Sequence, residues 1–174
     1  YLGRGPDVAA WYDCQLEISG PVLEHLQVTF AEDWAFASDE RLTDDRYYTA
    51  SGETGKGRVQ ILATGPDTET RQVESVLFDA FVNASESITI VTPYFVPSDV
   101  IVESLRCACR KGVRVRIVHP RETDRAITLW AARSFYDKLL AAGVEMFELP
   151  RGMLHSKIVI VDDRWACVGS TNMD

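Results

Sequence analysis

Apolar and polar positions change their period several times along the chain, and each period predicts a type of secondary structure. Short alternating or continuous apolar runs are typical of strands, whereas apolar residues recurring every three or four positions are typical of amphipathic helices. The pattern predicts strands at 14–18, 59–63, 88–92, 113–118, 144–149, 157–161 and 165–168. It predicts helices at 20–37, 68–84, 97–111 and 124–142.

The order of these elements predicts the fold class. From residue 58 onward strands alternate with helices, which favours an α/β fold with a mixed, largely parallel sheet flanked by helices. The last two strands are separated only by residues 162–164, so we expect a hairpin that adds an antiparallel edge to the sheet.

An acidic and then glycine-rich stretch interrupts the pattern before this unit. Residues 38–57 have no apolar period, which predicts a loop or linker. We therefore expect residues 1–45 to belong to a preceding unit, residues 46–57 to form a flexible loop, and residues 58–174 to form a separate lobe.

Charge is distributed unevenly along the 174 residues. The formal net charge is −8, which argues against non-specific nucleic-acid binding as the main activity. Residues 106–174, however, hold 12 basic and 8 acidic side chains and carry a local charge of +4. An anionic ligand would be attracted to this part of the chain, although basic residues at the solvated end of a helix account for the excess equally well.

The spacing of the cysteines and the length of the apolar runs bear on zinc binding, on the redox compartment and on membrane insertion. The four cysteines form no C-x-x-C pair and have no histidine cluster, so we expect buried thiols in a reducing, cytoplasmic-type compartment rather than a zinc site. No apolar run approaches the roughly 18–20 residues that a membrane-spanning helix needs. We therefore expect this part of the protein to be soluble by itself.

The last twenty residues carry the candidate chemistry. His155 and Lys157 are two positions apart in a strand-like stretch and should point to the same face. An imidazole can act as nucleophile or general acid/base near neutral pH, and an adjacent ammonium can hold a phosphate oxygen. Ser170 and Asn172 can donate hydrogen bonds to the same oxygens, and Asp162 in the hairpin turn can hold a basic partner. We expect no metal and no cofactor, because the lysine and these donors supply the electrostatic stabilisation.

This spacing resembles the HKD motif of the phospholipase D superfamily. It consists of H-x-K at 155–157, Asp162 after four further residues, and G-S-x-N at 169–172. The stretches VTPYFVPSD (91–99), GVRVRIVHP (112–120) and AAGVEMFEL (141–149) are similar to the second half of bacterial cardiolipin synthases. The stretch YDCQLEISGPVLEHLQVTFAEDW (12–34) is similar to the segment that follows their first HKD motif. The resemblance covers nearly the whole chain except the loop at 38–57.

The resemblance implies how the site is organised. Members of the superfamily bring two HKD motifs together at one active site between two similar lobes. Neither His25 nor His119 has a lysine two positions later, so this chain is expected to begin just after the first motif and to end inside the second. Residues 1–45 would then be the tail of the first lobe and residues 58–174 the second lobe, and the segment alone would be inactive.

The resemblance also implies a mechanism and a substrate class. The intact enzyme would convert two phosphatidylglycerol molecules into cardiolipin and glycerol through a phosphohistidine intermediate. His155 would act as general acid/base, Lys157 and Asn172 would bind phosphate oxygens with help from Ser170, and Asp162 would be structural or orienting. The partners would be an anionic phospholipid, the first HKD lobe and a cell membrane reached through segments outside this chain, whereas nucleic acid is not expected.

Several assignments stay open at the level of sequence. Tyr94 and Phe95 follow a strand end and would either line a substrate cleft or pack in the core. Trp130 and Phe135 are expected in the core, and residues 169–174 are expected to be poorly ordered. The alternative functions are a phospholipase D-type hydrolase with water as acceptor, a nuclease of the same superfamily built by dimerisation, and a non-catalytic binding module.

Overall fold

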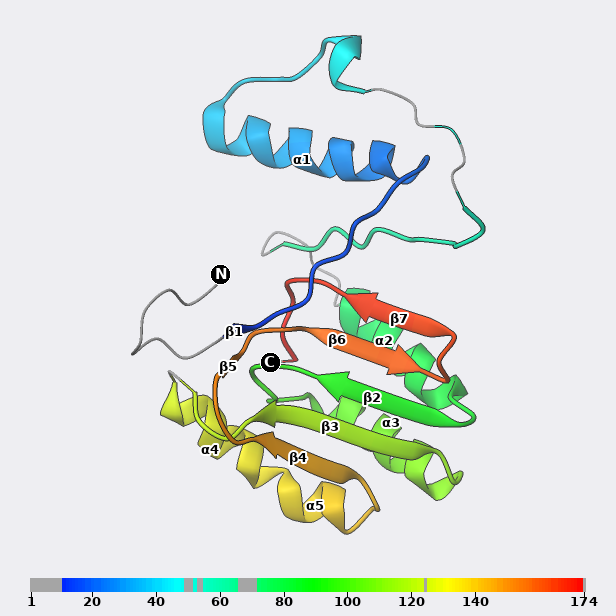
Figure 1. Ribbon diagram of the computed structural model, residues 1–174, viewed down its shortest axis with the longest axis vertical. Coiled ribbons are helices and arrows are strands. Elements are labelled where there is room, and N and C mark those ends of the chain that lie inside the picture. Colours follow the sequence, from blue (N-terminus) through cyan, green and yellow to red (C-terminus); the bar gives the residue numbers. More distant parts are fainter. Residues whose placement is uncertain (1–10, 49–51, 53–54, 66–71, 124, 174) are drawn as a thin grey trace. The chain divides into compact units, whose positions relative to one another are not determined.

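Two compact units divide the chain, one comprising Tyr1–Gln15 with Glu74–Asp174 and the other Leu16–Val73. The computed structural model describes residues 11–48, 52, 55–65, 72–123 and 125–173, and Figure 1 shows their secondary structure. The segment before Leu16 thus groups with the end of the chain, a division that does not coincide with the boundaries expected near residues 45 and 58.

A five-stranded mixed sheet forms the centre of the first unit. Its strand order is β4-β3-β2-β6-β7, with β2 (Ser87–Val91), β3 (Arg114–Pro120) and β4 (Glu145–Leu149) parallel to one another. β6 (Ile158–Val161) pairs antiparallel with β2, and β7 (Trp165–Val168) pairs antiparallel with β6. The predicted largely parallel α/β sheet with an antiparallel edge is therefore confirmed.

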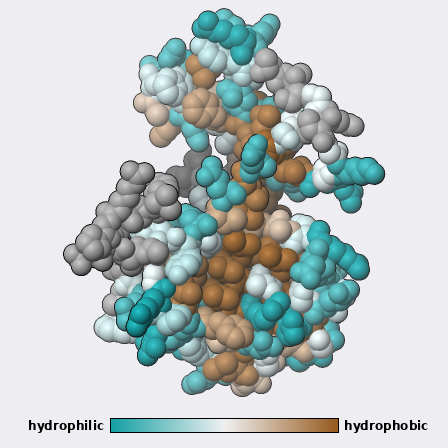
Figure 2. Space-filling view, viewed as in Figure 1, coloured by the Kyte–Doolittle hydropathy of each residue, from teal (hydrophilic) through white to brown (hydrophobic). Residues whose placement is uncertain are grey.

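Side chains of the sheet alternate between a buried face and a more open face. Ile88 and Ile90 of β2 and their β3 partners Val115 and Ile117 are fully buried, and Figure 1 shows α2 (Gln72–Asn83) and α3 (Asp99–Arg110) behind the sheet. The opposite face is only half-buried although it is largely apolar, and Figure 2 shows hydrophobic residues gathered over this unit. Its apolar members include the half-buried Val91, Val118, Ile158 and Ile160 and the exposed Phe147.

Local signals at its two ends define α3. The Oγ of Ser98 accepts a hydrogen bond from Ile101 N (3.4 Å) and caps the N-terminus. Asp99 in the first turn and Arg110 in the last turn complement the helix dipole. Gly112 follows with a φ of 87°, a conformation that favours glycine, and lets the chain turn directly into β3.

Two helices, α4 (Ala126–Ser134) and α5 (Tyr136–Leu140), take the place of the single helix predicted at 124–142. Phe135 separates them, and its N–H donates to the carbonyl oxygen of Ala132 (3.1 Å) in a tight turn that ends α4. The predicted start of the helix, Asp124, lies outside the described residues.

A second, two-stranded sheet joins the two ends of the first unit. β1 (Trp11–Tyr12) pairs in parallel with β5 (Met153–Leu154). Neither strand was predicted, because two residues are too short to show a period.

The second unit contains α1 (Leu23–Ser38) and the 3₁₀-helix η1 (Asp45–Tyr47). The structure describes all of α1 and none of its residues is buried. The strand predictions at 14–18 and 59–63 are wrong, since both described stretches run without strand pairing. Among the helices that the structure describes, none has the length and apolar character needed to cross a bilayer.

Candidate active site

One end of the five-stranded sheet gathers the candidate residues. The pairing register places Ile158, the first residue of β6, between Val91, the last residue of β2, and Val168, the last residue of β7. His155 and Lys157 shortly precede β6, and Ser170 and Asn172 shortly follow β7. The sheet topology therefore brings both halves of the sequence motif to the same end of the sheet.

Strand β1 fixes the backbone around His155. The carbonyl oxygen of Tyr12 accepts hydrogen bonds from His155 N (2.8 Å), Ser156 N (3.2 Å) and Ser156 Oγ (3.0 Å). Together with the β1–β5 pairing, these bonds hold the chain extended just before β6. The direction in which the imidazole points is therefore set by residues from the other end of the chain.

The imidazole of His155 contacts an acidic and an aromatic side chain. Its Nδ1 lies 2.9 Å from Oδ2 of Asp13, and its ring centroid lies 5.1 Å from a ring centroid of Trp11. The side chain of His155 keeps 43 % of its surface exposed, so a ligand can reach the ring.

The hydrogen bond with His155 lowers the pKa of the Asp13 carboxyl, and a hydrogen bond from Cys14 N lowers it further. Asp13 is therefore a carboxylate at neutral pH, and it accepts a hydrogen bond from the Nδ1–H of the imidazole. This assignment leaves Nε2 as the ring nitrogen for proton or phosphoryl transfer.

Lys157 brings a positive charge to the same place. Its Nζ donates to the carbonyl oxygen of His155 (2.7 Å), which turns the half-buried lysine side chain back toward the histidine. Its charge also helps to lower the pKa of Asp13. An ammonium here can hold a phosphate oxygen and stabilise charge that develops in a transition state.

The segment after β7 is attached to the same end of the sheet. Gly169 N donates to the carbonyl oxygen of Lys157 (3.3 Å), and Val96 N donates to that of Met173 (2.7 Å). Met173 is buried and also forms a parallel bridge with Phe95.

The segment at 169–174 was expected to be poorly ordered. Within its described residues, 169–173, Met173 is packed through its pairing with the stretch after β2, whereas Gly169, Ser170 and Thr171 are exposed; residue 174 lies outside the described part. Ser170 is exposed, whereas Asn172 is half-buried. The Oδ1 of Asn172 is buried and has no hydrogen-bond partner among the described residues, so a polar group at this end of the sheet remains to be satisfied by a ligand or by water.

Asp162 lies at the opposite end of β6 from His155 and Lys157. Five residues of extended chain separate it from Lys157, which corresponds to about 16 Å. In place of a basic partner, its carboxylate accepts hydrogen bonds from Ser85 N (2.9 Å), Ser85 Oγ (2.8 Å), Glu86 N (2.7 Å) and Ser87 N (2.9 Å). These bonds lower the pKa of Asp162 well below its usual range. Its role in this geometry is to connect the β6–β7 turn to the start of β2.

The two residues expected near a substrate cleft differ in position. Phe95 is 1 % exposed and belongs to the core, so its side chain packs rather than lining a cleft. Tyr94 is half-buried, and its carbonyl oxygen accepts a hydrogen bond from Thr92 Oγ1 (2.7 Å) at the end of β2.

A polar cluster that includes a buried histidine lies where β3 and β4 meet α4 and α5. The buried His119 is hydrogen-bonded to the hydroxyl of Tyr136, which also donates to Glu148 Oε1 (2.9 Å). Arg133 donates to the same Oε1 through Nε (3.2 Å) and NH2 (3.1 Å). Burial lowers the pKa of His119 and raises that of Tyr136, so both are neutral at neutral pH.

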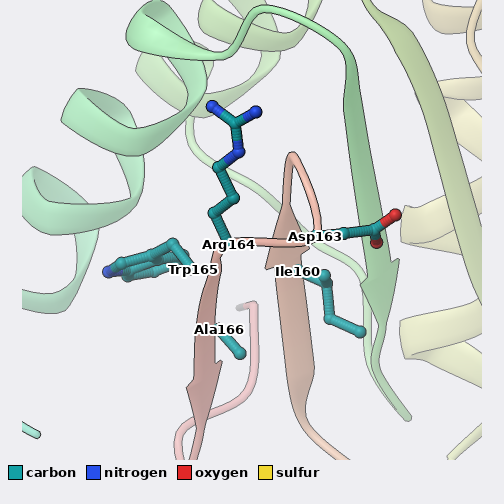
Figure 3. Close-up of a pocket in the computed structure, with 5 residues that line it drawn as sticks. All are labelled: Ile160, Asp163, Arg164, Trp165 and Ala166. Atoms are coloured by element: carbon teal, nitrogen blue, oxygen red, sulfur yellow. The ribbon is translucent and has the colours of Figure 1, made fainter. Parts of the chain in front are cut away.

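A surface depression of about 300 Å³ lies beside the β6–β7 hairpin, lined by Ile160 and residues 163–166 (Figure 3). Figure 3 shows Asp163 and Trp165 pointing to opposite sides of the turn. None of the candidate site residues lines this depression.

Sequence reasoning missed Asp13 and Trp11. The stretch from residue 12 was noted for its similarity to a family segment, but an acidic residue 142 positions before His155 gives no local sign of contact with it. The pairing of β1 with β5 and the hydrogen bonds to the carbonyl oxygen of Tyr12 bring these residues to the histidine, and neither leaves a pattern in the sequence.

A family model matches the part of the chain that forms the five-stranded sheet. The model described as the phospholipase D-like domain of cardiolipin synthase matches residues 77–174, more than half of the chain. The chain therefore belongs to the phospholipase D-like domain family of the cardiolipin synthases.

Individual proteins extend the similarity over the whole chain. It is 37 % identical over 176 aligned residues to the cardiolipin synthase of Geobacillus thermodenitrificans and 39 % identical to that of Halalkalibacterium halodurans. Each alignment covers 100 % of this chain and 35 % of the relative, so the chain spans about a third of the length of these relatives. Among solved structures, NucT from Helicobacter pylori is similar with a TM-score of 0.50 and 20 % identity, covering 60 % of this chain and 69 % of NucT, which bears on the fold alone.

Proposed function

We propose that this chain supplies one half of the active site of a phosphatidyltransferase of the cardiolipin synthase type. The proposed substrate is phosphatidylglycerol, and the products are cardiolipin and glycerol. The other half of the site would come from a lobe that carries the first HKD motif, and the protein would reach the membrane through segments outside these residues.

The observation that carries the proposal is the setting of His155. Its Nδ1 is held by the Asp13 carboxylate at 2.9 Å while Lys157 lies beside it in the chain, so Nε2 is the nitrogen presented for transfer chemistry. Pairing of a carboxylate with the far nitrogen of an imidazole fixes the ring orientation and stabilises the imidazolium form. This arrangement is what a general acid/base needs at a phosphorus centre.

The proposed steps balance as two displacements at phosphorus. In the first, a histidine of the other motif forms a bond to phosphorus, the bond from phosphorus to the glycerol oxygen breaks, and His155 protonates the leaving glycerol. In the second, His155 removes the proton from a hydroxyl of another phosphatidylglycerol, whose oxygen displaces the histidine and forms cardiolipin. Lys157 and Asn172, with Ser170 at the rim, would stabilise the phosphate oxygens, while Asp162 would support the sheet from its other end.

The test uses the protein encoded by the complete reading frame that contains these residues, in membranes with isotopically labelled phosphatidylglycerol. Lipid products are measured by mass spectrometry for the natural sequence, for His155→Ala, and for His25→Ala as a control at an exposed histidine of α1. We expect labelled cardiolipin and glycerol from the natural sequence and from the control, and loss of both products in His155→Ala.

Two results would overturn the proposal in different ways. Phosphatidic acid without cardiolipin would mean that water is the acceptor and that the protein is a hydrolase. No turnover of lipid would refute the lipid substrate, and hydrolysis of single-stranded DNA or RNA in the same preparation would then favour the nuclease alternative.

A further inference from the structure

Helix α4 exposes its two largest apolar side chains to solvent. Ile127 is 73 % exposed and Trp130 is 70 % exposed, whereas Ala132 of the same helix is buried and Leu129 is half-buried. Ile127 and Trp130 are three positions apart and therefore lie next to each other on the outer face of the helix. The core position expected for Trp130 is thus wrong, because Ala132 and Leu129, and not Trp130, lie on the inward face of α4.

This apolar face lies near the end of the sheet that holds the candidate site. α4 begins six residues after β3 ends, and β3 ends at the same edge as β2, where Thr92 N donates to the carbonyl oxygen of Val118 (3.1 Å). Arg121 N donates to the carbonyl oxygen of Leu149 (3.0 Å), which ties the start of this connection to the end of β4 shortly before β5. Figure 1 shows α4 and β5 at the same end of the first unit.

Basic side chains flank the apolar face. Arg121 and Arg125 are exposed ahead of α4, while Arg133 at its end is paired with Glu148 (3.1 Å). In the sequence, residues 121–134 hold three arginines against the two acidic residues Glu122 and Asp124, a local charge of +1. The whole stretch from residue 106 onward carries a charge of +4, in contrast to the net −8 of the chain.

We propose that Ile127 and Trp130, together with Arg121 and Arg125, form a docking surface for the interface of an anionic phospholipid bilayer. The proposal rests on the proposed function, because the docking surface would hold the candidate active site next to the lipid phosphates on which it acts. Tryptophan has an amphipathic ring that favours the headgroup level of a bilayer, and arginine attracts the phosphates there. Two side chains that protrude from a convex helix suit insertion into a fluid interface, whereas anchors of protein partners usually fill concave, tightly packed pockets.

The test measures binding of the 174-residue chain to sedimentable vesicles, with no turnover involved. Vesicles of phosphatidylglycerol and phosphatidylcholine in equal amounts are compared with vesicles of phosphatidylcholine alone. The variants are the double substitution Ile127→Ser with Trp130→Ser and the double substitution Arg121→Gln with Arg125→Gln. The matched control is Phe36→Ser, since Phe36 is 95 % exposed on α1.

We expect binding to the anionic vesicles that falls at least about 10-fold in each double variant and stays unchanged in the control. Thermal unfolding monitored by circular dichroism should be unchanged in the apolar double variant, because both side chains are already exposed. Failure of the natural chain to bind, unchanged binding in the apolar double variant, or an equal loss in Phe36→Ser would overturn the proposal. A second copy as the true occupant would show as a dimer in size-exclusion chromatography that the apolar double variant converts to a monomer.

The design separates this proposal from the proposed function. His155→Ala should bind the same vesicles as the natural chain, since the histidine is not part of the docking surface. Vesicle binding that persists while the complete protein shows no lipid turnover would refute the proposed function and leave the docking surface standing. Cardiolipin formation that persists in the apolar double variant of the complete protein, with vesicle binding also unchanged, would refute the docking surface alone.

Discussion

The carboxylate of Asp162 lies 2.7 Å from the backbone nitrogen of Glu86, at the end of β6 remote from His155. The aspartate of the H-x-K…D spacing therefore acts on the fold in this chain, by receiving hydrogen bonds from the start of β2, rather than on the histidine. The spacing of four residues between Lys157 and Asp162 is then the length of β6 itself.

We expect Asp162→Asn to lower the melting temperature by about 5 °C or more, because an amide nitrogen would face backbone N–H donors that now bond to a carboxylate oxygen. Asn also adopts the positive φ of this position (54°), so the substitution tests the hydrogen bonds and not backbone strain. Asp163→Asn is the matched control, since Asp163 has a similar φ of 51° in the same turn.

The melting temperatures of Asp162→Asn and Asp163→Asn should depend differently on pH in the acidic range. The pKa of Asp162 is lower in the folded than in the unfolded protein, so its contribution to stability is complete above its unfolded pKa and is lost as pH falls toward its folded pKa. The melting temperature of the natural chain and of Asp163→Asn should therefore fall more steeply below about pH 4 than that of Asp162→Asn. Parallel curves for all three proteins would contradict this assignment.

Asp13 is predicted to act as a positioning residue for His155. In the complete protein, Asp13→Asn should lower kcat by about 10-fold to 100-fold with little change in KM, because the imidazole loses its orientation and its charge partner but the lipid contacts remain. Asp13→Glu should recover part of the loss, whereas Glu17→Gln, at an exposed acid of the same segment, should behave like the natural protein. A change in KM alone, or equal effects at Asp13 and Glu17, would argue against the positioning role.

Lys157 is predicted to stabilise the transition state rather than the fold. Lys157→Met should lower kcat/KM by on the order of 100-fold or more while changing the melting temperature by only a few degrees. Lys138→Met provides the comparison, because it removes a half-exposed lysine of α5 that pairs with Glu103 of α3 at 2.9 Å and is not one of the candidate site residues. If both substitutions reduced activity equally, a general effect of charge would explain the result better than a phosphate contact.

His119 is predicted to make stability depend on pH between about 5 and 7. Burial lowers its pKa in the folded protein despite the nearby Glu148, so the unfolded state takes up the proton first as pH falls below about 6.5. The stability associated with neutral His119 is therefore present above this pH and is lost below it. Melting temperatures measured at pH 7.5 and 5.5 should differ more for the natural chain than for His119→Gln, by about 3 °C. His25→Gln, at an exposed histidine, should leave that difference unchanged.

Long periodic segments could be predicted from the sequence, whereas isolated short pairings could not. The apolar runs of β2, β3 and β4 and the hairpin of β6 and β7 carry their own period and turn signals, and all five strands form as expected. The predicted strands at 14–18 and 59–63 have a similar apolar content but lie outside the five-stranded sheet, and no strand among the described residues completes their hydrogen bonds. The helix at 124–142 breaks at Phe135, a position without glycine or proline to indicate it.

The candidate site was partly predictable for the same reason. His155 and Lys157 precede β6 and Ser170 and Asn172 follow β7, so the predicted β6–β7 hairpin is enough to bring them to one end of the sheet. The roles of Asp13 and Asp162 depend on bonds to residues 142 and about 76 positions away, which no local pattern encodes.

The pairing of β1 with β5 has a consequence for the order in which the protein is made. At a translation rate of about 5–20 residues per second, Asp13 is synthesised roughly 7 to 28 s before His155. During that interval β5 has not been synthesised, so Trp11 and Tyr12 have no strand to pair with. The strands of the main sheet that have already been synthesised can begin to form in the meantime. The contact between Asp13 and His155 can therefore form only after residue 155 has been synthesised, when most of the unit already exists.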